Sequence, residues 1–240
     1  MIGILGGMGP AATADFYLKV IEEAHAGCDE DHVPLLIQSD PRIARRPAAI
    51  LSGGESPLPA LLVSRDRLIA AGALALAMPC NTAHYWHAQL VADCPVPFLS
   101  IVDASCDEVA GLAPPGARIG LIATRGTVAG RVFDAPLVAR GYAPLHCTDD
   151  ELDTAVLPAI ELVKVGRADA AGRLLEPAIE ALLRRGAAAV ILACTETPMA
   201  LDAVASPLRA RCVDTNRALA RACVRLWAQL RDDVRSVSPG

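Results

Sequence analysis

The sequence predicts an α/β protein made of two similar lobes, each with a mostly parallel sheet between layers of helices. Three observations lead to this fold class. Short runs rich in Val, Ile, Leu and Ala alternate with longer helical patterns along the 240 residues. The short runs are apolar throughout, which is typical of parallel strands buried on both faces. The two halves of the chain also resemble each other weakly, and such a repeat indicates a duplicated unit.

The first half predicts an alternation of strands and helices. The expected strands are 1–5, 33–38 and 73–78, and the expected helices are 11–26, 57–71 and 83–92. Parallel strands need a long crossover connection, and a helix is the usual one. The alternation therefore predicts a parallel sheet with helices on its faces.

The second half repeats this order of elements. The expected strands are 118–123, 142–147 and 187–193, and the expected helices are 128–140, 170–185 and about 214–230. The segment 119–123 resembles 2–6, and 194–196 resembles 80–82 in its place after an apolar strand. Two halves of roughly 110 residues are implied.

Proline-rich stretches and the position of the last helix indicate the boundaries of the two lobes. Proline-rich stretches at 95–97 and 114–116 bracket the expected crossover between the halves. The last helix is expected to return to the first half, because no other element of the repeat is left to cover that helix. We therefore predict a first lobe of residues 1–98 plus 210–240 and a second lobe of residues 99–209.

The composition favours a protein that acts on a small molecule. The chain is 53% hydrophobic, which is ample for a buried core and argues against disorder. Its formal net charge of −5 offers no broad attraction for nucleic acid or for an anionic membrane. The N-terminus enters a strand-like run without a basic leader, and no apolar stretch has the length of a membrane span. We expect a cytoplasmic enzyme with a small ligand as its partner.

Two of the eight cysteines stand out by their position. Cys80 and Cys194 each follow an apolar strand in matching places of the two halves, and ligands of parallel sheets bind at these strand ends. Backbone N–H groups at the start of a turn or helix stabilise a thiolate there. The other six show no CxxC pairing and no polar surroundings, so we interpret them as reduced structural residues: Cys28, Cys94, Cys106, Cys147, Cys212 and Cys223.

Two thiols that face each other across a cleft suit the inversion of a stereocentre. One removes a proton from one side of a carbon, and the other delivers a proton to the opposite side. A thiol with an ordinary pKa near 8.5 needs only modest tuning to act as acid or base near neutrality.

The motifs around these cysteines resemble the aspartate/glutamate racemase superfamily. The chain carries Gly-Gly-Met-Gly-Pro at 6–10, Pro-Cys-Asn-Thr-Ala-His at 79–84 and Cys-Thr-Glu at 194–196. The resemblance covers nearly the whole chain and implies two Rossmann-like three-layer lobes related by a pseudo-twofold axis, with the active site between them. It also implies catalysis by Cys80 and Cys194 without pyridoxal phosphate or another cofactor, and a homodimer. Glu196 stands where the glutamate branch has His, which favours the aspartate branch.

The same resemblance supplies candidate substrate-binding residues. Arg46 resembles the arginine that holds the distal carboxylate, since its planar fork suits bidentate binding, and Lys164 resembles a lysine near the site. Thr124 resembles the threonine that helps to hold the α-carboxylate. The remaining candidates are Met8, Asn81, Thr82, Thr195 and Glu196. Aspartate is the expected substrate, with glutamate or a broad specificity as alternatives, because Arg45, Pro47, Ala193 and Thr197 depart from the family pattern.

Other functions remain open at this stage. Gly7, Gly9 and Ala12 fit a loose dinucleotide fingerprint, but the expected acidic residue is missing from its place. His84 and His87 lie one helical turn apart without an evident third metal ligand, so we expect no metal site and interpret His84 as part of the first cysteine loop. The rival functions are an isomerase or decarboxylase of the maleate, hydantoin or arylmalonate type and a non-catalytic amino-acid-binding protein.

Overall fold

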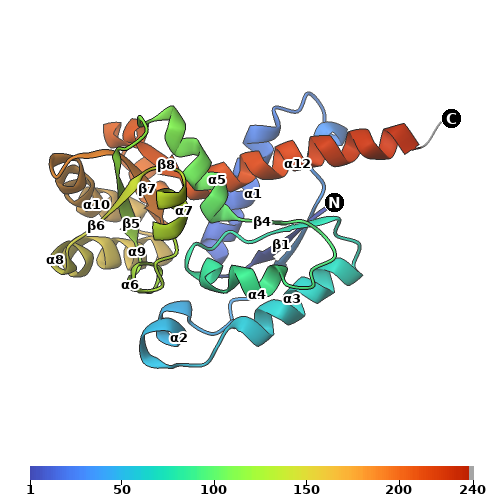
Figure 1. The fold of residues 1–240 in the computed structure, drawn as a ribbon, viewed down its shortest axis with the longest axis horizontal. Coiled ribbons are helices and arrows are strands. Elements are labelled where there is room, and N and C mark those ends of the chain that lie inside the picture. The colour runs from blue at the N-terminus through green and yellow to red at the C-terminus, as the bar shows by residue number, and fades with distance from the viewer. Residues whose placement is uncertain (238–240) are drawn as a thin grey trace.

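The computed structural model describes residues 1–237 and shows two lobes, each built around one sheet (Figure 1). The first sheet has the order β2 (Leu35–Ser39), β1 (Ile2–Gly6), β3 (Ala75–Ala77) and β4 (Phe98–Leu99). The second has the order β6 (Ala143–His146), β5 (Arg118–Ala123), β7 (Ala187–Ala193) and β8 (Cys212–Asp214). All neighbouring strands are parallel. The two sheets share one strand order, which confirms the predicted pair of α/β lobes.

Helices surround both sheets. The first half of the chain contains α1 (Pro10–Ala24), α2 (Arg46–Ser52), α3 (Leu58–Ala70), α4 (His87–Val91) and α5 (Ile101–Glu108). The second half contains α6 (Arg125–Ala129), α7 (Asp134–Ala139), α8 (Asp149–Glu151), α9 (Leu157–Lys164), α10 (Ala168–Arg184), α11 (Thr197–Ala203) and α12 (Thr215–Val237). Shorter helical segments are η1 (Asp29–Asp31), η2 (Thr82–Trp86), η3 (Val109–Gly111), η4 (Leu152–Val156) and η5 (Pro207–Arg211). None of the described helices is long and apolar enough to cross a bilayer.

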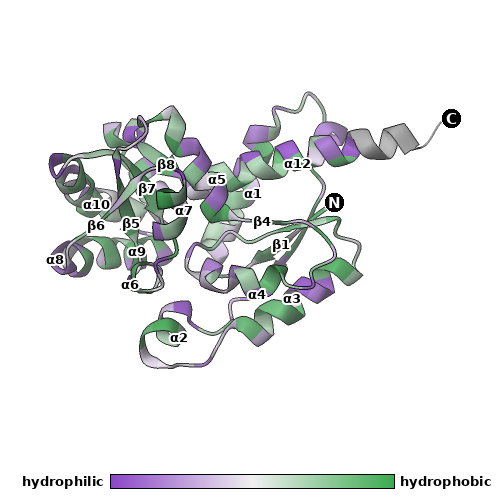
Figure 2. Ribbon diagram, viewed as in Figure 1, coloured by the Kyte–Doolittle hydropathy of each residue, from purple (hydrophilic) through white to green (hydrophobic). Residues whose placement is uncertain are grey.

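Burial of one helix face explains how these elements pack. Figure 2 shows hydrophilic and hydrophobic residues side by side on the helices of both lobes. In α10 the buried residues recur at the spacing of a single helix face: Ala171, Gly172, Leu175, Ala178, Ile179 and Leu182. Gly172 lets this face approach α11, since a Cβ there would lie 2.3 Å from the Ala200 carbonyl oxygen.

The two lobes share part of their hydrophobic core. One continuous cluster of buried residues includes Ile2 and Phe16 of the first lobe together with Ile119 and Ile191 of the second sheet. Leu219 of α12 belongs to the same cluster, and α12 runs from the second lobe along α1 (Figure 1). The shared core fixes the position of one lobe relative to the other, so the side chains that the two lobes contribute to the site are held in place by close packing.

A buried ionic network ties α12 to the first lobe. Lys19 of α1 lies 2.7 Å from Asp15 and 2.8 Å from Asp214, which ends β8. Asn216 donates a hydrogen bond of 2.8 Å to Asp15. Because β8 pairs with the second sheet, we propose that the return to the first lobe occurs at Thr215, later than the predicted position 210. Residues 238–240 of the predicted first lobe lie outside the described residues.

The single helix predicted at 128–140 is wrong. The helix α6 ends at Ala129, and α7 begins at Asp134. Arg131 between them has φ = +50°, which interrupts a right-handed helix. A Cβ at Gly130 would lie 2.7 Å from the Tyr85 ring, so the chain turns where the first lobe packs against it.

Candidate active site between the lobes

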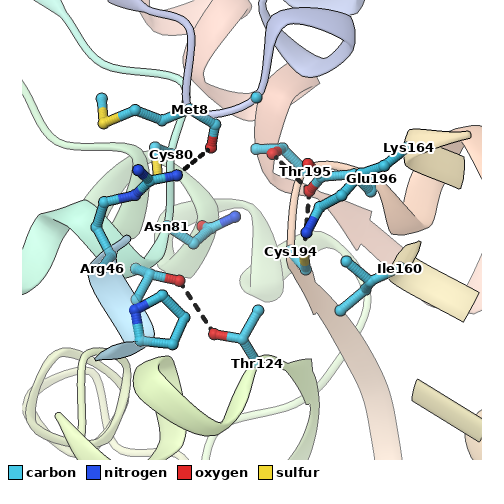
Figure 3. A pocket seen from close by; sticks show the side chains of 13 residues that line it. Met8, Arg46, Cys80, Asn81, Thr124, Ile160, Lys164, Cys194, Thr195 and Glu196 are labelled. Atoms are coloured by element: carbon cyan, nitrogen blue, oxygen red, sulfur yellow. Dashed lines mark hydrogen bonds between the residues drawn. The ribbon is translucent and has the colours of Figure 1, made fainter. Parts of the chain in front are cut away.

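A small pocket of about 120 Å³ lies between the two lobes (Figure 3). The side chains predicted for the site all line it: Met8, Arg46, Cys80, Asn81, Thr82, Thr124, Lys164, Cys194, Thr195 and Glu196. Pockets for drug-sized ligands are typically about 300–1,000 Å³. The pocket therefore suits a ligand no larger than an amino acid.

The two cysteines reach the pocket from equivalent strands. Cys194 follows directly on β7, and Cys80 comes three residues after β3 ends at Ala77. The strands β3 and β7 occupy the same place in their sheets. The carboxyl ends of two equivalent strands therefore lead into the pocket, one from each lobe. Figure 3 shows the cysteines on opposite sides of the pocket. Both are buried, with 5% and 6% of their surface exposed.

A buried histidine holds the loop of the first cysteine. His84 Nε2 accepts a hydrogen bond of 3.0 Å from the Ile101 N–H, so its proton lies on Nδ1. That Nδ1–H donates to the Cys80 carbonyl oxygen at 2.8 Å. Burial lowers the pKa of His84 to about 3, which keeps the ring neutral. The prediction that His84 belongs to the cysteine loop is therefore confirmed.

Neither ring nitrogen of His84 is free to bind a metal. His84 stacks on His87 with ring centroids 5.0 Å apart, and both ring nitrogens of His84 are engaged by the backbone. Among the side chains that the structure describes, residues 1–231, no three His, Cys, Asp or Glu groups gather as a metal site would require.

The charges near the two thiols differ in sign. Burial raises the pKa of the Cys80 thiol, and the Arg46 guanidinium opposes that rise. Burial and the Glu196 carboxylate together raise the pKa of the Cys194 thiol well above its ordinary value. Cys194 Sγ donates to Glu196 Oε2 at 3.1 Å, and the Thr195 hydroxyl donates to the same oxygen at 3.2 Å.

Three threonine hydroxyls meet across the two lobes. Thr82 Oγ1 lies 3.1 Å from Thr124 Oγ1 and 2.8 Å from Thr127 Oγ1, and the latter two are 3.1 Å apart. The Thr124 side chain also caps α6 by accepting from the Thr127 N–H at 3.2 Å. Sequence reasoning missed Thr127, because its hydroxyl meets Thr82 across the two lobes and no local pattern marks that contact.

Asn81 joins the pocket to the start of α12. Its Nδ2 donates to Thr215 Oγ1 at 3.0 Å, and that hydroxyl donates in turn to the Leu192 carbonyl oxygen at 3.1 Å. The Asn81 Oδ1 atom is buried and has no hydrogen-bond partner within the described part of the chain. A buried acceptor of this kind is costly unless a ligand or water donates to it.

The guanidinium of Arg46 is partly occupied by the backbone. Nη1 donates to the carbonyl oxygens of Ile43 and Ala44 at 3.1 and 3.0 Å, and Nη2 donates to that of Met8 at 3.2 Å. Nε is buried without a partner among the described residues. Of the five N–H groups of an arginine, two therefore remain for a ligand, the number that a bidentate carboxylate needs.

Lys164 lines the pocket, but its ammonium group pairs with a glutamate at the surface. It lies in the last turn of α9, and its Nζ is 2.7 Å from Glu161 Oε1 at the surface. Its side chain is 45% exposed. A ligand would compete with Glu161 for this ammonium group.

Three further pocket residues were not predicted: Gly9, Pro47 and Ile160. Ile160 lies on α9, a helix for which we predicted no element. Pro47 lies close to α6, since a Cβ at Gly126 would be 2.9 Å from its Cα. Ile160 reaches the pocket through packing between segments that are distant in the sequence, so no local signal was available for it. Pro47 directly follows the predicted Arg46 in the sequence.

The glycine-rich turn after β1 is explained by backbone packing. Gly7 has φ = +92°, and a Cβ there would lie 2.4 Å from the Asp40 backbone nitrogen. The Gly7 N–H donates to Thr13 Oγ1 at 2.9 Å, which joins the turn to α1. These contacts explain why glycine is needed at position 7, so the glycine-rich turn does not require a bound dinucleotide as its explanation.

Comparisons with known proteins agree with this geometry. A family model described as Asp/Glu/Hydantoin racemase matches residues 5–223. The broad specificity amino-acid racemase RacX of Bacillus subtilis (strain 168) is 27% identical over 230 residues, which cover 93% of this chain and 96% of that protein. The aspartate racemase of Picrophilus torridus superposes with a TM-score of 0.82 at 29% identity, covering 95% of this chain and 94% of the other. A glutamate racemase from Francisella tularensis shares the fold, with a TM-score of 0.65 at 15% identity over 100% of this chain and 83% of the other.

Proposed function

Because the chain belongs to the Asp/Glu/hydantoin racemase family, we propose that it is an amino-acid racemase, an isomerase that inverts Cα without an organic cofactor or a metal. The observation that carries this proposal is the placement of Cys80 and Cys194. They enter one small pocket from the matching strands of two lobes. A protein that only binds an amino acid would need neither thiol.

The reaction uses the two thiols in opposite protonation states. The thiolate of one cysteine removes the Cα proton, and the thiol of the other delivers its proton to the opposite face of the carbon. The substrate must present its Cα between them, so its carboxylates have to be anchored. We assign the α-carboxylate to the hydroxyl groups of Thr82 and Thr124, with Asn81 and Thr195 beside them. Met8 and Ile160 supply apolar wall.

An acidic amino acid, with aspartate ahead of glutamate, is the proposed substrate. Arg46 has two N–H groups left for a distal carboxylate, and Lys164 adds a positive charge at the pocket. The small volume of the pocket favours the shorter side chain. The relative from Picrophilus torridus is named an aspartate racemase, whereas the one from Bacillus subtilis is named for broad specificity. Broad specificity is therefore the second candidate.

The test is a racemisation assay without added pyridoxal phosphate. L- and D-aspartate, glutamate, alanine and a bulky neutral amino acid are incubated in D₂O, and chirality and deuterium at Cα are followed by chiral chromatography and NMR. We expect both enantiomers of an acidic substrate to exchange and interconvert. Release of CO₂ would instead indicate a decarboxylase, and a ligand that binds without exchange would indicate a binding protein.

Single substitutions test the roles of the two cysteines. We expect Cys80→Ser and Cys194→Ser each to abolish racemisation, because a serine hydroxyl is too weak an acid to replace a thiol near neutrality. Cys28→Ser is the matched control, since Cys28 is exposed and outside the pocket. Near wild-type rates in both directions for either pocket variant would contradict the two-thiol mechanism.

We propose a homodimer on the resemblance alone, with the amino acid as its small-molecule partner. A cytoplasmic location is proposed because the cysteines are interpreted as reduced thiols. Sedimentation equilibrium of the purified chain tests the assembly, and a monomer at micromolar concentration would refute it.

A further inference from the structure

The two pocket cysteines have partners of opposite charge. Cys194 Sγ lies 3.1 Å from Glu196 Oε2, and Glu196 is only 5% exposed. An ionised carboxylate only accepts hydrogen bonds, so the proton in this contact is the thiol's. Burial raises the pKa of the Cys80 thiol as well, and Glu196 adds to that rise. Cys80, in contrast to Cys194, also lies in the field of the Arg46 guanidinium, which lowers its pKa and acts more strongly on it than Glu196 does.

The groups around Glu196 leave its negative charge directed at Cys194. Thr195 donates a hydrogen bond to the same carboxylate oxygen. Gly9 of the first lobe approaches the other oxygen, since a Cβ there would lie 3.4 Å from Oε1. Lys164 is the nearby cation that opposes the effect on Cys194, but it pairs with Glu161 at the surface. Removing the proton from Cys194 would therefore place a thiolate against a buried carboxylate.

We propose that Glu196 is a catalytic residue that keeps Cys194 protonated in the resting enzyme, so that Cys80 is the thiolate that first meets substrate. The inference rests on the proposed racemase function, because it assigns the protons of that reaction. It also distinguishes the two directions: the enantiomer whose Cα–H faces Cys80 meets the resting form, and the other enantiomer requires the protons to be exchanged.

The proton balance of one turnover follows from this assignment. The Cys80 thiolate forms an S–H bond with the Cα proton, and the electron pair of the broken C–H bond stays on the substrate. The Cys194 S–H bond breaks as its proton bonds to the opposite face of Cα. The enzyme is left with a Cys80 thiol and a Cys194 thiolate beside Glu196. It returns to the resting form when Cys80 loses a proton to water and Cys194 gains one.

The experiment measures the protonation of each thiol without using racemisation. The wild-type protein is treated with iodoacetamide from pH 6.5 to 10, and the rate of alkylation of each cysteine is followed by peptide mass spectrometry. Only the thiolate reacts, so the rate reports the thiolate fraction. At pH 7.5 we expect Cys80 to be alkylated at least about tenfold faster than Cys194. Equal rates, or a faster Cys194, would overturn the proposal without relying on any variant.

Single-cysteine backgrounds then test the role of Glu196. In the Cys80→Ser background we expect Glu196→Gln to accelerate alkylation of Cys194 at pH 7.5 by about tenfold, since one unit of pKa is a tenfold change in thiolate below the pKa. In the Cys194→Ser background the same substitution should change Cys80 much less. Glu180→Gln is the matched control, because Glu180 is an exposed glutamate in the same lobe that pairs with Arg184 and does not line the pocket. An unchanged Cys194 rate in a folded Glu196→Gln protein would overturn the proposal.

The two proposals fail in different ways. A chain that shows the expected asymmetry in alkylation but no exchange at Cα retains this protonation assignment and loses the racemase function. A chain that racemises amino acids but alkylates both cysteines alike keeps the proposed function and loses the role of Glu196.

Discussion

Replacement of Arg46 separates substrate recognition from support of the loop. Three of its N–H groups hold the carbonyl oxygens of Ile43, Ala44 and Met8, while two remain for a ligand. In Arg46→Ala the loss of the three backbone contacts, and of the charge beside Cys80, affects every substrate. The loss of the two remaining donors affects only substrates with a distal carboxylate.

The size of the selective effect follows from these two donors. A charge-assisted bidentate contact contributes about 1.5–3 kcal/mol. At 1.36 kcal/mol for each factor of ten, kcat/KM for aspartate should fall by roughly 10- to 150-fold more than kcat/KM for alanine. The ratio of the two losses cancels the part that comes from the loop and from Cys80, so it is the quantity to report.

The assay compares kcat/KM for aspartate, glutamate, alanine and a bulky neutral amino acid in wild type, Arg46→Ala and Arg46→Lys. Lysine keeps the charge but cannot supply both the backbone contacts and a bidentate fork. The selective loss of kcat/KM for aspartate in Arg46→Lys should therefore be close to the loss in Arg46→Ala. Arg42→Ala is the control, because Arg42 is an exposed arginine on the same loop that pairs with Asp40 and does not line the pocket. Equal losses on all four substrates would show that Arg46 only holds the loop. A wild type that prefers neutral amino acids would refute the acidic substrate.

Two further predictions concern residues that position the site. Thr127→Val removes the hydroxyl that joins Thr82 to Thr124. We expect KM to rise about 5- to 30-fold, which corresponds to a loss of about 1–2 kcal/mol of binding, with little change in kcat. Thr127→Ser keeps the hydroxyl and should restore the wild-type KM. A fall in kcat at constant KM would count against a role in binding. The neutral His84 has a pKa lowered to about 3 from an ordinary 6.5, so the unfolded chain binds the extra proton and stability is lost as the pH falls below about 6.5. Urea denaturation at pH 8 should show His84→Gln to be less stable than wild type, and the gap should narrow towards pH 5; a constant gap would mean that His84 does not titrate in this way.

Much of the fold could be predicted because burial leaves a local pattern in the sequence. The runs at 118–123 and 187–193 coincide with β5 and β7 as observed, since strands covered on both faces are apolar along nearly their whole length, with the exposed Arg118 at the start of β5 as the exception. The strands β4 and β8 were missed because they have only two and three residues and lie at the edges of their sheets. The helix α9 was missed as well, although its Ile160 lines the pocket.

The candidate site was predictable to the extent that the repeat marks it. Cys80 and Cys194 follow equivalent strands, so the topology alone brings both to the interface. Contacts across that interface left no such mark. Thr127 meets Thr82 only because the two lobes pack together, and the break of the helix after Ala129 reflects the ring of Tyr85 from the other lobe.

The sequence by itself determined the class of fold and the two cysteines, because these depend on hydrophobic periodicity and on motifs of a few adjacent residues. The set of side chains expected around the cysteines came from the resemblance to the racemase family. Only the tertiary structure decided the electrostatic state of that set. It placed the Arg46 guanidinium near Cys80 with two donors free, buried His84 as a neutral ring and paired Lys164 with Glu161. The physical reason is that burial and charge act through space: the pKa of a thiol depends on which groups surround it and on how much water they exclude, whatever their separation along the chain.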